Sequence, residues 1–378
     1  MKKKIFIAIL LIVGFIAALL ILLPDKKDKT LSSITPSVSN QLSILICDNE
    51  GENCDESANV PTGSYIIDEE QTYCEGGGKV GNYDASAGTI KYNVKGNDEC
   101  TIYFKESINY LSQMVLAKES SRDYTSSQDG SIYRVVNQNG VRYEGKNPDN
   151  YVEFNGGELW RIIGTFNGAD IGLDSTKYYT KIIKAQSTIT KAQGNTLAGT
   201  YLDWVNSPAN TYLNGEYYNS LTSDAQNMIA KYNDEFSTWH IRAAAEWQDF
   251  FASDWYSIER STGTAVSVAT QNAAIGLMYP SDYGYAAYGS NCNNTSTETL
   301  DNYSNNCGTV DWLSLSGENP QWLITTLYWS SSSSMSVINR AVQPLIGMER
   351  LIFPTLYLEA DIVVDSGEGT SELPYILK

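Results

Sequence analysis

The stretch that decides the fold is YVEFNGGELWRIIG, which runs from Tyr151 to Gly164. Two runs suited to β-strands, Tyr151 to Phe154 and Leu159 to Ile163, flank the pair Asn155-Gly156. Asn-Gly between two such runs is a strong local signal for a β-hairpin, because both residues tolerate the positive φ angles of a two-residue turn. We therefore expect a hairpin here, and we expect it to open the main domain.

The last quarter of the chain holds the segments expected to complete that domain. Ile352 to Leu358 (IFPTLYL) is predicted to be a strand, and Gly367 to Leu377 combines a glycine turn with a short apolar strand. Ile275 to Tyr285 reads IGLMYPSDYGY, and Trp322 to Ser334 is an aromatic run that ends in serines. Strands so far from the hairpin in sequence imply a sheet built from distant segments.

Together with residues 151–164, these segments resemble a C-type-lectin-like, formylglycine-generating-enzyme-like domain of anchored surface proteins from Gram-positive bacteria. The resemblance covers residues 150–378. It implies an α+β head whose two ends lie side by side as strands, so that the hairpin pairs near Leu373 to Leu377. We expect the head to bind a ligand, to perform no chemistry and to need no cofactor.

The N-terminus has the pattern of a membrane anchor. Lys2 to Lys4 precede Ile5 to Leu23, an apolar run without a charged residue that is long enough to cross a bilayer as a helix. The run ends without the small residues of a signal-peptide cleavage site, although a cleaved signal remains the alternative. We therefore expect a single-pass cell-membrane protein with a cytoplasmic N-terminus and extracellular C-terminal domains.

Changes in composition divide the rest of the chain. We predict a transmembrane signal anchor over 1–24, a Ser/Thr/Pro-rich tether over 25–42, a small β module over 43–104, a helical connector over 105–149 and the head over 150–378. The expected fold class is α+β: an N-terminal transmembrane helix, a small all-β disulfide module and a C-type-lectin-like α+β head.

Helical spacing of apolar residues predicts three helices. One covers Glu106 to Glu119, and one begins at a Ser-x-x-Gln capping box formed by Ser223 and Gln226. Ala243 to Phe251 repeats the helical spacing, which places His240 between the second and third helices.

The six cysteines form three locally spaced pairs. They are Cys47 with Cys54, Cys74 with Cys100, and Cys292 with Cys307, which we predict to be disulfides, although six cysteines also allow other pairings. A zinc site is disfavoured because the chain has no Cys-x-x-Cys motif and a single histidine, His240. No metal site is expected, and the acids of Asp361 to Glu368 do not match a calcium-binding loop.

The charge of the chain limits its partners. The formal net charge is −18 at pH 7, which disfavours binding to nucleic acid. The chain also has no Gly-x-Ser-x-Gly elbow and no Walker loop, which leaves paired carboxylates as the one open route to catalysis.

The aromatic run of the last quarter supplies the candidate binding residues. Aromatic and arginine side chains are common on contact surfaces. The expected function is binding of a glycan or protein ligand; the alternatives are a cell-wall glycan hydrolase that uses paired carboxylates and a passive envelope component. The predicted ligand-binding residues are Trp312, Trp322, Tyr328, Trp329 and Arg340; the alternative is that these aromatic side chains fill the core of the head.

Overall fold

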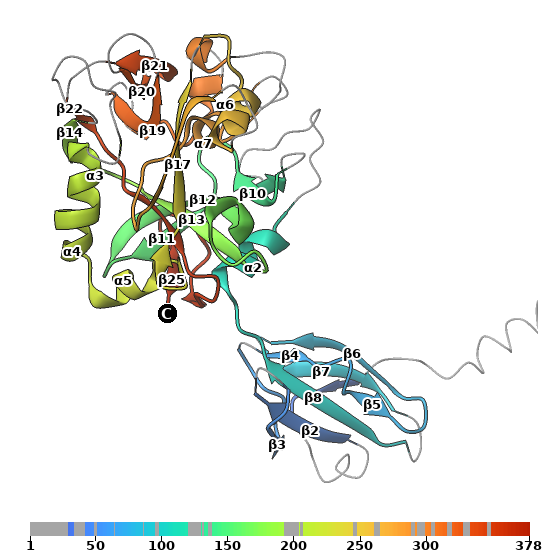
Figure 1. The fold of residues 1–378 in the computed structure, drawn as a ribbon. Coiled ribbons are helices and arrows are strands. Elements are labelled where there is room, and N and C mark those ends of the chain that lie inside the picture. Colours follow the sequence, from blue (N-terminus) through green and yellow to red (C-terminus); the bar gives the residue numbers. More distant parts are fainter. Residues whose placement is uncertain are drawn as a thin grey trace, which may run out of the picture. The chain divides into compact units, whose positions relative to one another are not determined.

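The chain forms two compact units, Met1–Ile108 and Asn109–Lys378, and each has its own core (Figure 1). They are called unit 1 and unit 2 below. The computed structural model describes residues 29–33, 42–48, 51–63, 65–85, 87–94, 98–119, 130, 132–134, 138–192, 204, 207–244, 248–260, 265–288, 292, 299–303, 307–315, 320–327, 333–345 and 349–378.

Unit 1 consists of two small sheets that bury a shared core. The three-stranded sheet has the order β1-β7-β6, and the five-stranded sheet has the order β3-β2-β8-β4, with β5 also paired to β8. Ile44 and Ile102 of one sheet and Ile90 of the other are fully buried in that core. The strands are β1 (Lys29–Leu31), β2 (Leu42–Cys47), β3 (Cys54–Ser57), β4 (Tyr65–Ile67), β5 (Tyr73–Cys74), β6 (Lys79–Asp84), β7 (Thr89–Asn93) and β8 (Cys100–Glu106).

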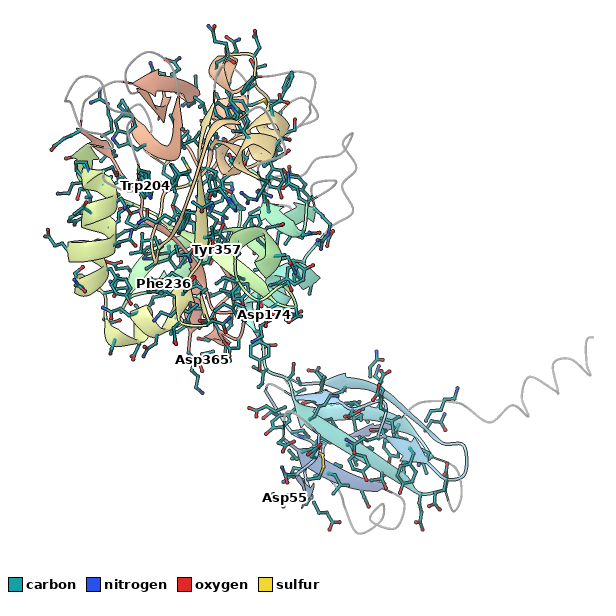
Figure 2. The ribbon with its side chains drawn as sticks, in the orientation of Figure 1. Asp55, Asp174, Trp204, Phe236, Tyr357 and Asp365 are labelled. Atoms are coloured by element: carbon teal, nitrogen blue, oxygen red, sulfur yellow. A yellow bond between two sulfur atoms is a disulfide. The ribbon has the colours of Figure 1, made fainter. Side chains whose placement is uncertain are left out.

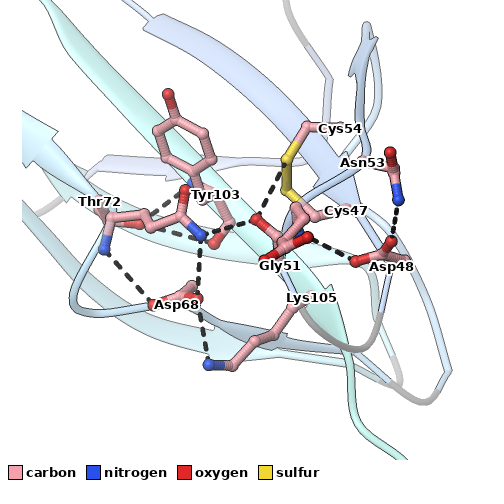
Figure 3. Close-up of a disulfide and its surroundings, with 11 residues drawn as sticks. Cys47, Asp48, Gly51, Asn53, Cys54, Asp68, Thr72, Tyr103 and Lys105 are labelled. Atoms are coloured by element: carbon pink, nitrogen blue, oxygen red, sulfur yellow. Dashed lines mark hydrogen bonds and ion pairs between the residues drawn. A yellow bond between two sulfur atoms is a disulfide. The ribbon is translucent and has the colours of Figure 1, made fainter.

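Hydrogen bonds join two loops of unit 1 beside the Cys47–Cys54 disulfide (Figure 3). The carbonyl of Gly51 accepts a hydrogen bond from the Gln71 side chain at 2.8 Å. Asp68, which is paired with Lys105 at 3.0 Å, also accepts from the backbone N–H of Gln71. These contacts fix the 48–54 loop against the 68–72 loop.

The first sheet of unit 2 has eight strands. Its order is β23-β13-β12-β11-β25-β24, and β10 pairs with both β12 and β9. The strands are β9 (Ile132–Arg134), β10 (Gly140–Tyr143), β11 (Tyr151–Phe154), β12 (Glu158–Asn167), β13 (Tyr178–Lys184), β23 (Thr355–Leu358), β24 (Val364–Ser366) and β25 (Tyr375–Leu377).

The end of the chain closes this sheet at the predicted hairpin. Strand β25 lies parallel to β11, with Val152 opposite Tyr375 and Glu153 opposite Ile376. The expected pairing of the hairpin with the C-terminal strand is therefore confirmed. The turn itself has three residues, not two, because Phe154 pairs with Glu158; Asn155, Gly156 and Gly157 between them all have positive φ.

The second sheet of unit 2 has seven strands in the order β14-β22-β19-β17-β18, with β20 paired to β19 and β21. Figure 1 shows α3, α4 and α5 following one another along one side of unit 2. The remaining strands of unit 2 are β14 (Thr190–Ala192), β15 (Lys231–Tyr232), β16 (Glu235–Phe236), β17 (Thr238–Ala244), β18 (Ala265–Asn272), β19 (Gln321–Leu327), β20 (Ser333–Ile338), β21 (Ala341–Leu345) and β22 (Glu349–Leu351). The helices are α2 (Leu111–Ala117), η1 (Gly168–Ile171), α3 (Pro208–Tyr212), η3 (Leu213–Tyr217), α4 (Tyr218–Ser220), α5 (Ser223–Met228), α6 (Ala252–Glu259), α7 (Pro280–Gly284), η4 (Leu300–Asn302) and η5 (Cys307–Thr309).

The predicted fold class, an α+β head behind an N-terminal transmembrane helix, is wrong. Strands make up 41% of the described structure and helices 19%, so the chain is mainly β. Part of the error lies at Ala243, which was expected in a helix and belongs to strand β17. The apolar spacing of a buried strand between two partners resembles that of a buried helix, and tertiary pairing decides between them.

The predicted single-pass localisation is also corrected. In the part of the chain that the structure describes, no helix is long and apolar enough to cross a membrane. The predicted span, residues 5–23, lies outside that part. The anchor and the topology built on it therefore have no support in the structure.

Domain boundaries differ from those expected in two places. Lys29–Leu31, inside the predicted tether, forms strand β1 of unit 1. Strands β9 and β10, inside the predicted helical connector, belong to the first sheet of unit 2. The predicted helix at Glu106 is reduced to α2, and the helix at Ser223 is capped one residue earlier, where the Thr222 hydroxyl accepts from Ala225 N–H.

Candidate functional site

The candidate site lies where the chain crosses twice between the two sheets of unit 2. After β13 the chain leaves the first sheet and joins the second as β14; after β22 it returns to the first as β23. Two backbone hydrogen bonds join the crossings: Lys184 N–H donates to the Pro354 carbonyl at 3.0 Å, and Ile352 N–H donates to the Ile189 carbonyl at 2.9 Å. The crossings therefore form a fixed pair of adjacent segments.

A groove of about 740 Å³ opens beside these crossings. Its volume is within the usual range of small-ligand sites. One wall is apolar and comes from Leu159, Ile189, Leu315, Leu351 and Phe353. The polar lining comes from Glu158, Lys184, Gln186, Ser187 and Thr188.

The charged residues of the groove form one ion pair. Lys184 Nζ lies 2.8 Å from Glu158 Oε1, and the second carboxylate oxygen of Glu158 accepts a hydrogen bond from the Trp160 indole at 3.2 Å. Lys184 also donates to the Tyr217 hydroxyl at 3.3 Å. Burial, followed by the nearby Glu158 carboxylate, raises the pKa of Tyr217 above its ordinary value, so Tyr217 is neutral at physiological pH.

The segment between the crossing strands presents uncharged polar groups. Gln186 and Thr188 are exposed, and Ser187 is partly buried, with its hydroxyl accepting from Ile189 N–H at 3.2 Å. Amide and hydroxyl groups can both donate and accept hydrogen bonds. The groove therefore pairs an apolar wall with a polar edge.

Two predicted binding residues have buried structural roles. Trp312 is 3% exposed, and its indole donates to the Tyr143 carbonyl at 3.0 Å. The guanidinium of Arg161 lies 4.5 Å from the Trp312 ring centre and 4.3 Å from that of Tyr151. Trp322 is 3% exposed as well, and its indole donates to the Lys191 carbonyl at 2.9 Å, where it holds β14 beside the groove.

The other three predicted binding residues are Tyr328, Trp329 and Arg340. Tyr328 and Trp329 lie outside the described residues. Arg340 is exposed in the turn between β20 and β21, and its carbonyl accepts from the Tyr283 hydroxyl at 2.9 Å.

The three predicted disulfides, Cys47–Cys54, Cys74–Cys100 and Cys292–Cys307, are all present. His240 lies in strand β17, not between two helices, and its backbone N–H donates to the Tyr279 hydroxyl at 2.8 Å. Across the described ranges no group of three or more His, Cys, Asp or Glu side chains is placed to hold a metal ion.

The sequence reasoning missed the groove residues. Glu158 begins β12 and Lys184 ends β13, the neighbouring antiparallel strand. The register of these two strands could have indicated that the two side chains lie close together. Ile352 to Leu358 was expected to be one continuous strand, whereas it is interrupted at residues 352–354. Pro354 lacks the N–H that a continuous ladder needs, and this was the available signal for the crossing.

Comparison with known protein families, with curated proteins and with solved structures finds no match to this chain. The resemblance to a C-type-lectin-like domain stays a prediction.

Proposed function

We propose that unit 2 is a binding module that holds an uncharged glycan in the groove beside the two crossings. The observation that carries this proposal is the combination of an apolar wall with the polar edge of Gln186, Ser187 and Thr188. A sugar ring has apolar C–H faces and a rim of hydroxyl groups, so it can meet both kinds of surface at once.

Charge supports an uncharged ligand. The chain has a net charge of −18, which repels acidic glycans, and the only described charges of the groove, Glu158 and Lys184, already neutralise each other. An acidic or basic ligand would find no unpaired opposite charge in the described lining.

Binding is favoured over glycan hydrolysis because the described groove lining contains a single carboxyl group, Glu158. Hydrolysis by the usual mechanisms needs two carboxyl groups across the bond that is cleaved. Glu158 is also occupied by Lys184 and by the Trp160 indole.

A glycan array followed by calorimetry tests the proposal. The chain should bind uncharged oligosaccharides. A double variant that carries both Gln186→Ala and Thr188→Ala should bind them about tenfold or more weakly, because two hydrogen bonds are lost. Arg340→Ala, outside the groove lining, should bind as the wild type does. Absence of glycan binding, or equal binding by all three proteins, would contradict the proposal and favour a passive component.

A further inference from the structure

Three cationic side chains converge on the other face of the first sheet. They are Arg142 on β10, Lys181 on β13 and Arg260 directly after α6, and they are called the cation cluster below. Lys181 and Lys184 are three positions apart on β13, so they project from opposite faces of the strand. The cluster is therefore separated from the groove by the sheet itself.

Contacts with shared neighbours bring the cluster together. Lys181 lies 2.5 Å from Asp282 on α7, and Arg142 lies 3.7 Å from the other oxygen of the same carboxylate. The guanidinium carbons of Arg142 and Arg260 lie 5.6 Å and 4.9 Å from the ring centre of Tyr256. Figure 2 shows Tyr357, which also faces Lys181, in the interior of unit 2.

Three acids lie near the cluster, and one of them, Asp282, pairs with the cluster itself through Lys181 and Arg142. One oxygen of Asp282 accepts from both Lys181 and Tyr279 N–H. Glu259 accepts from the N–H and the hydroxyl of Ser281. Asp170 is partly buried, and its carboxylate is attracted by Arg260 and Arg142 without a hydrogen bond to either among the contacts of the described residues.

Both arginines retain unmet hydrogen-bond donors. Arg142 is 1% exposed and donates to the Gln138 side chain, but its Nε has no hydrogen-bond partner in the described structure, and its second terminal nitrogen makes only the 3.7 Å ion pair with Asp282. Nε and one terminal nitrogen of Arg260 are also buried there without a partner. Leaving buried donors of a charged group unmet is costly, so a ligand that accepts from them is favoured.

We propose that Arg142 and Arg260 bind a small oxyanion beside Tyr256. A guanidinium presents a planar set of N–H donors that matches the oxygens of carboxylate, sulfate or phosphate groups. The rings of Phe166 and Tyr285, 4.6 Å and 5.3 Å from the Arg142 guanidinium, exclude water on its other sides. Arg260, Tyr256 and Asp170 are all partly exposed, which gives the anion a route from solvent.

Thermal unfolding of the full chain in sulfate tests this site. All eight tryptophans of the chain lie in unit 2, so tryptophan fluorescence follows that unit alone. At constant ionic strength, replacing chloride by sulfate should raise the Tm of the wild type saturably, by about 5 °C at a hundredfold excess over Kd. Arg260→Gln should lose the saturable part and keep only the general stabilisation that sulfate gives any protein.

Arg340→Gln is the matched control, because it removes an exposed arginine outside the cluster and should respond as the wild type does. If Arg260→Gln does not fold, the Nε–H resonances of Arg142 and Arg260 in the wild type should shift together on titration with sulfate. Repeating the titration with phosphate and acetate identifies the preferred oxyanion. An equal response of Arg260→Gln and wild type, or no shift of either arginine resonance, would overturn the proposal.

Discussion

Lys181 and Asp282, 101 residues apart in sequence, form an ion pair in which the side chains are only 1% and 2% exposed. The pair joins strand β13 of the first sheet to helix α7. Burial lowers the pKa of Lys181 to about 8, and the Asp282 carboxylate opposes that effect. The pair matters because a buried charge that loses its partner is strongly destabilising.

Asp282→Asn should lower the free energy of unfolding of unit 2 by about 3–5 kcal/mol, because it leaves Lys181 and Arg142 buried without their shared counter-charge. Urea unfolding followed by tryptophan fluorescence measures the loss. Asp365→Asn is the matched control, since Asp365 is exposed (Figure 2) and its replacement should change little. Equal effects of the two substitutions would show that the buried pair does not hold the sheet and helix together.

Glu259 should make unit 2 less stable as the pH rises. Its side chain is fully buried, and desolvation raises its pKa from 4.5 to about 7, against the opposing attraction of Arg260. The folded state therefore binds the proton more tightly than the unfolded state, so stability is lost as the pH rises from 4.5 to 7.

The fall should reach at most about 3 kcal/mol and should be absent in Glu259→Gln, which keeps a neutral side chain. The difference in unfolding free energy between wild type and variant is measured from pH 4.5 to 7.5, and comparing the two proteins at each pH sets aside the titration of Lys181, which both share. Glu372→Gln, at an exposed position, should keep the wild-type profile. A constant difference between wild type and Glu259→Gln would contradict the assignment.

The C-terminal strand is needed to fold unit 2. Deleting residues 371–378 removes β25, which pairs with β11 and β24, and the ring of Tyr375, which is 2% exposed. The truncated chain should lose the cooperative tryptophan-fluorescence transition. Leu373→Ser, at a 55% exposed position in the same segment, should retain it. A truncated protein with an unchanged transition would show that the closing strand is dispensable.

Gly51 should accept a side chain less readily than Gly77. Its φ is +77°, and a Cβ there would lie 2.9 Å from Gln71 Nε2 (Figure 3). Gly77 also has a positive φ, +82°, but a Cβ there would have nothing within 4 Å. Gly51→Ala should therefore destabilise unit 1 by about 1 kcal/mol more than Gly77→Ala, which carries the backbone cost alone.

Hydrogen exchange of strands β2 and β8 measures this difference, because both strands lie in the core of unit 1. Equal protection in the two variants would mean that the 48–54 loop yields to the added methyl group.

Local patterns predicted the features that depend on neighbouring residues. The Asn155-Gly156 turn and the three locally paired disulfides follow from short-range chemistry, and the pairing of β25 with β11 followed from the stated resemblance. The extra turn residue, Gly157, could have been suspected from its own tolerance of positive φ.

Local patterns did not reveal which side chains are buried or which side chains from distant segments meet. Trp312 and Trp322 were candidates both for a binding surface and for the core, and the structure buries them; aromatic content alone does not reveal which side chains the fold covers. The cation cluster collects Arg142, Lys181 and Arg260 from separate elements, and no local spacing links them. The groove depends on two strand crossings that only the assembled sheets define.

The most direct test of glycan binding in the groove is a methyl NMR titration of the full chain with an oligosaccharide found on the array. Shifts should be confined to the groove methyl groups of Leu159, Ile189, Leu315 and Leu351, while Ile44 and Ile102 in the core of unit 1 stay unchanged. Shifts that leave these groove residues unmoved and appear elsewhere would contradict the proposed binding site.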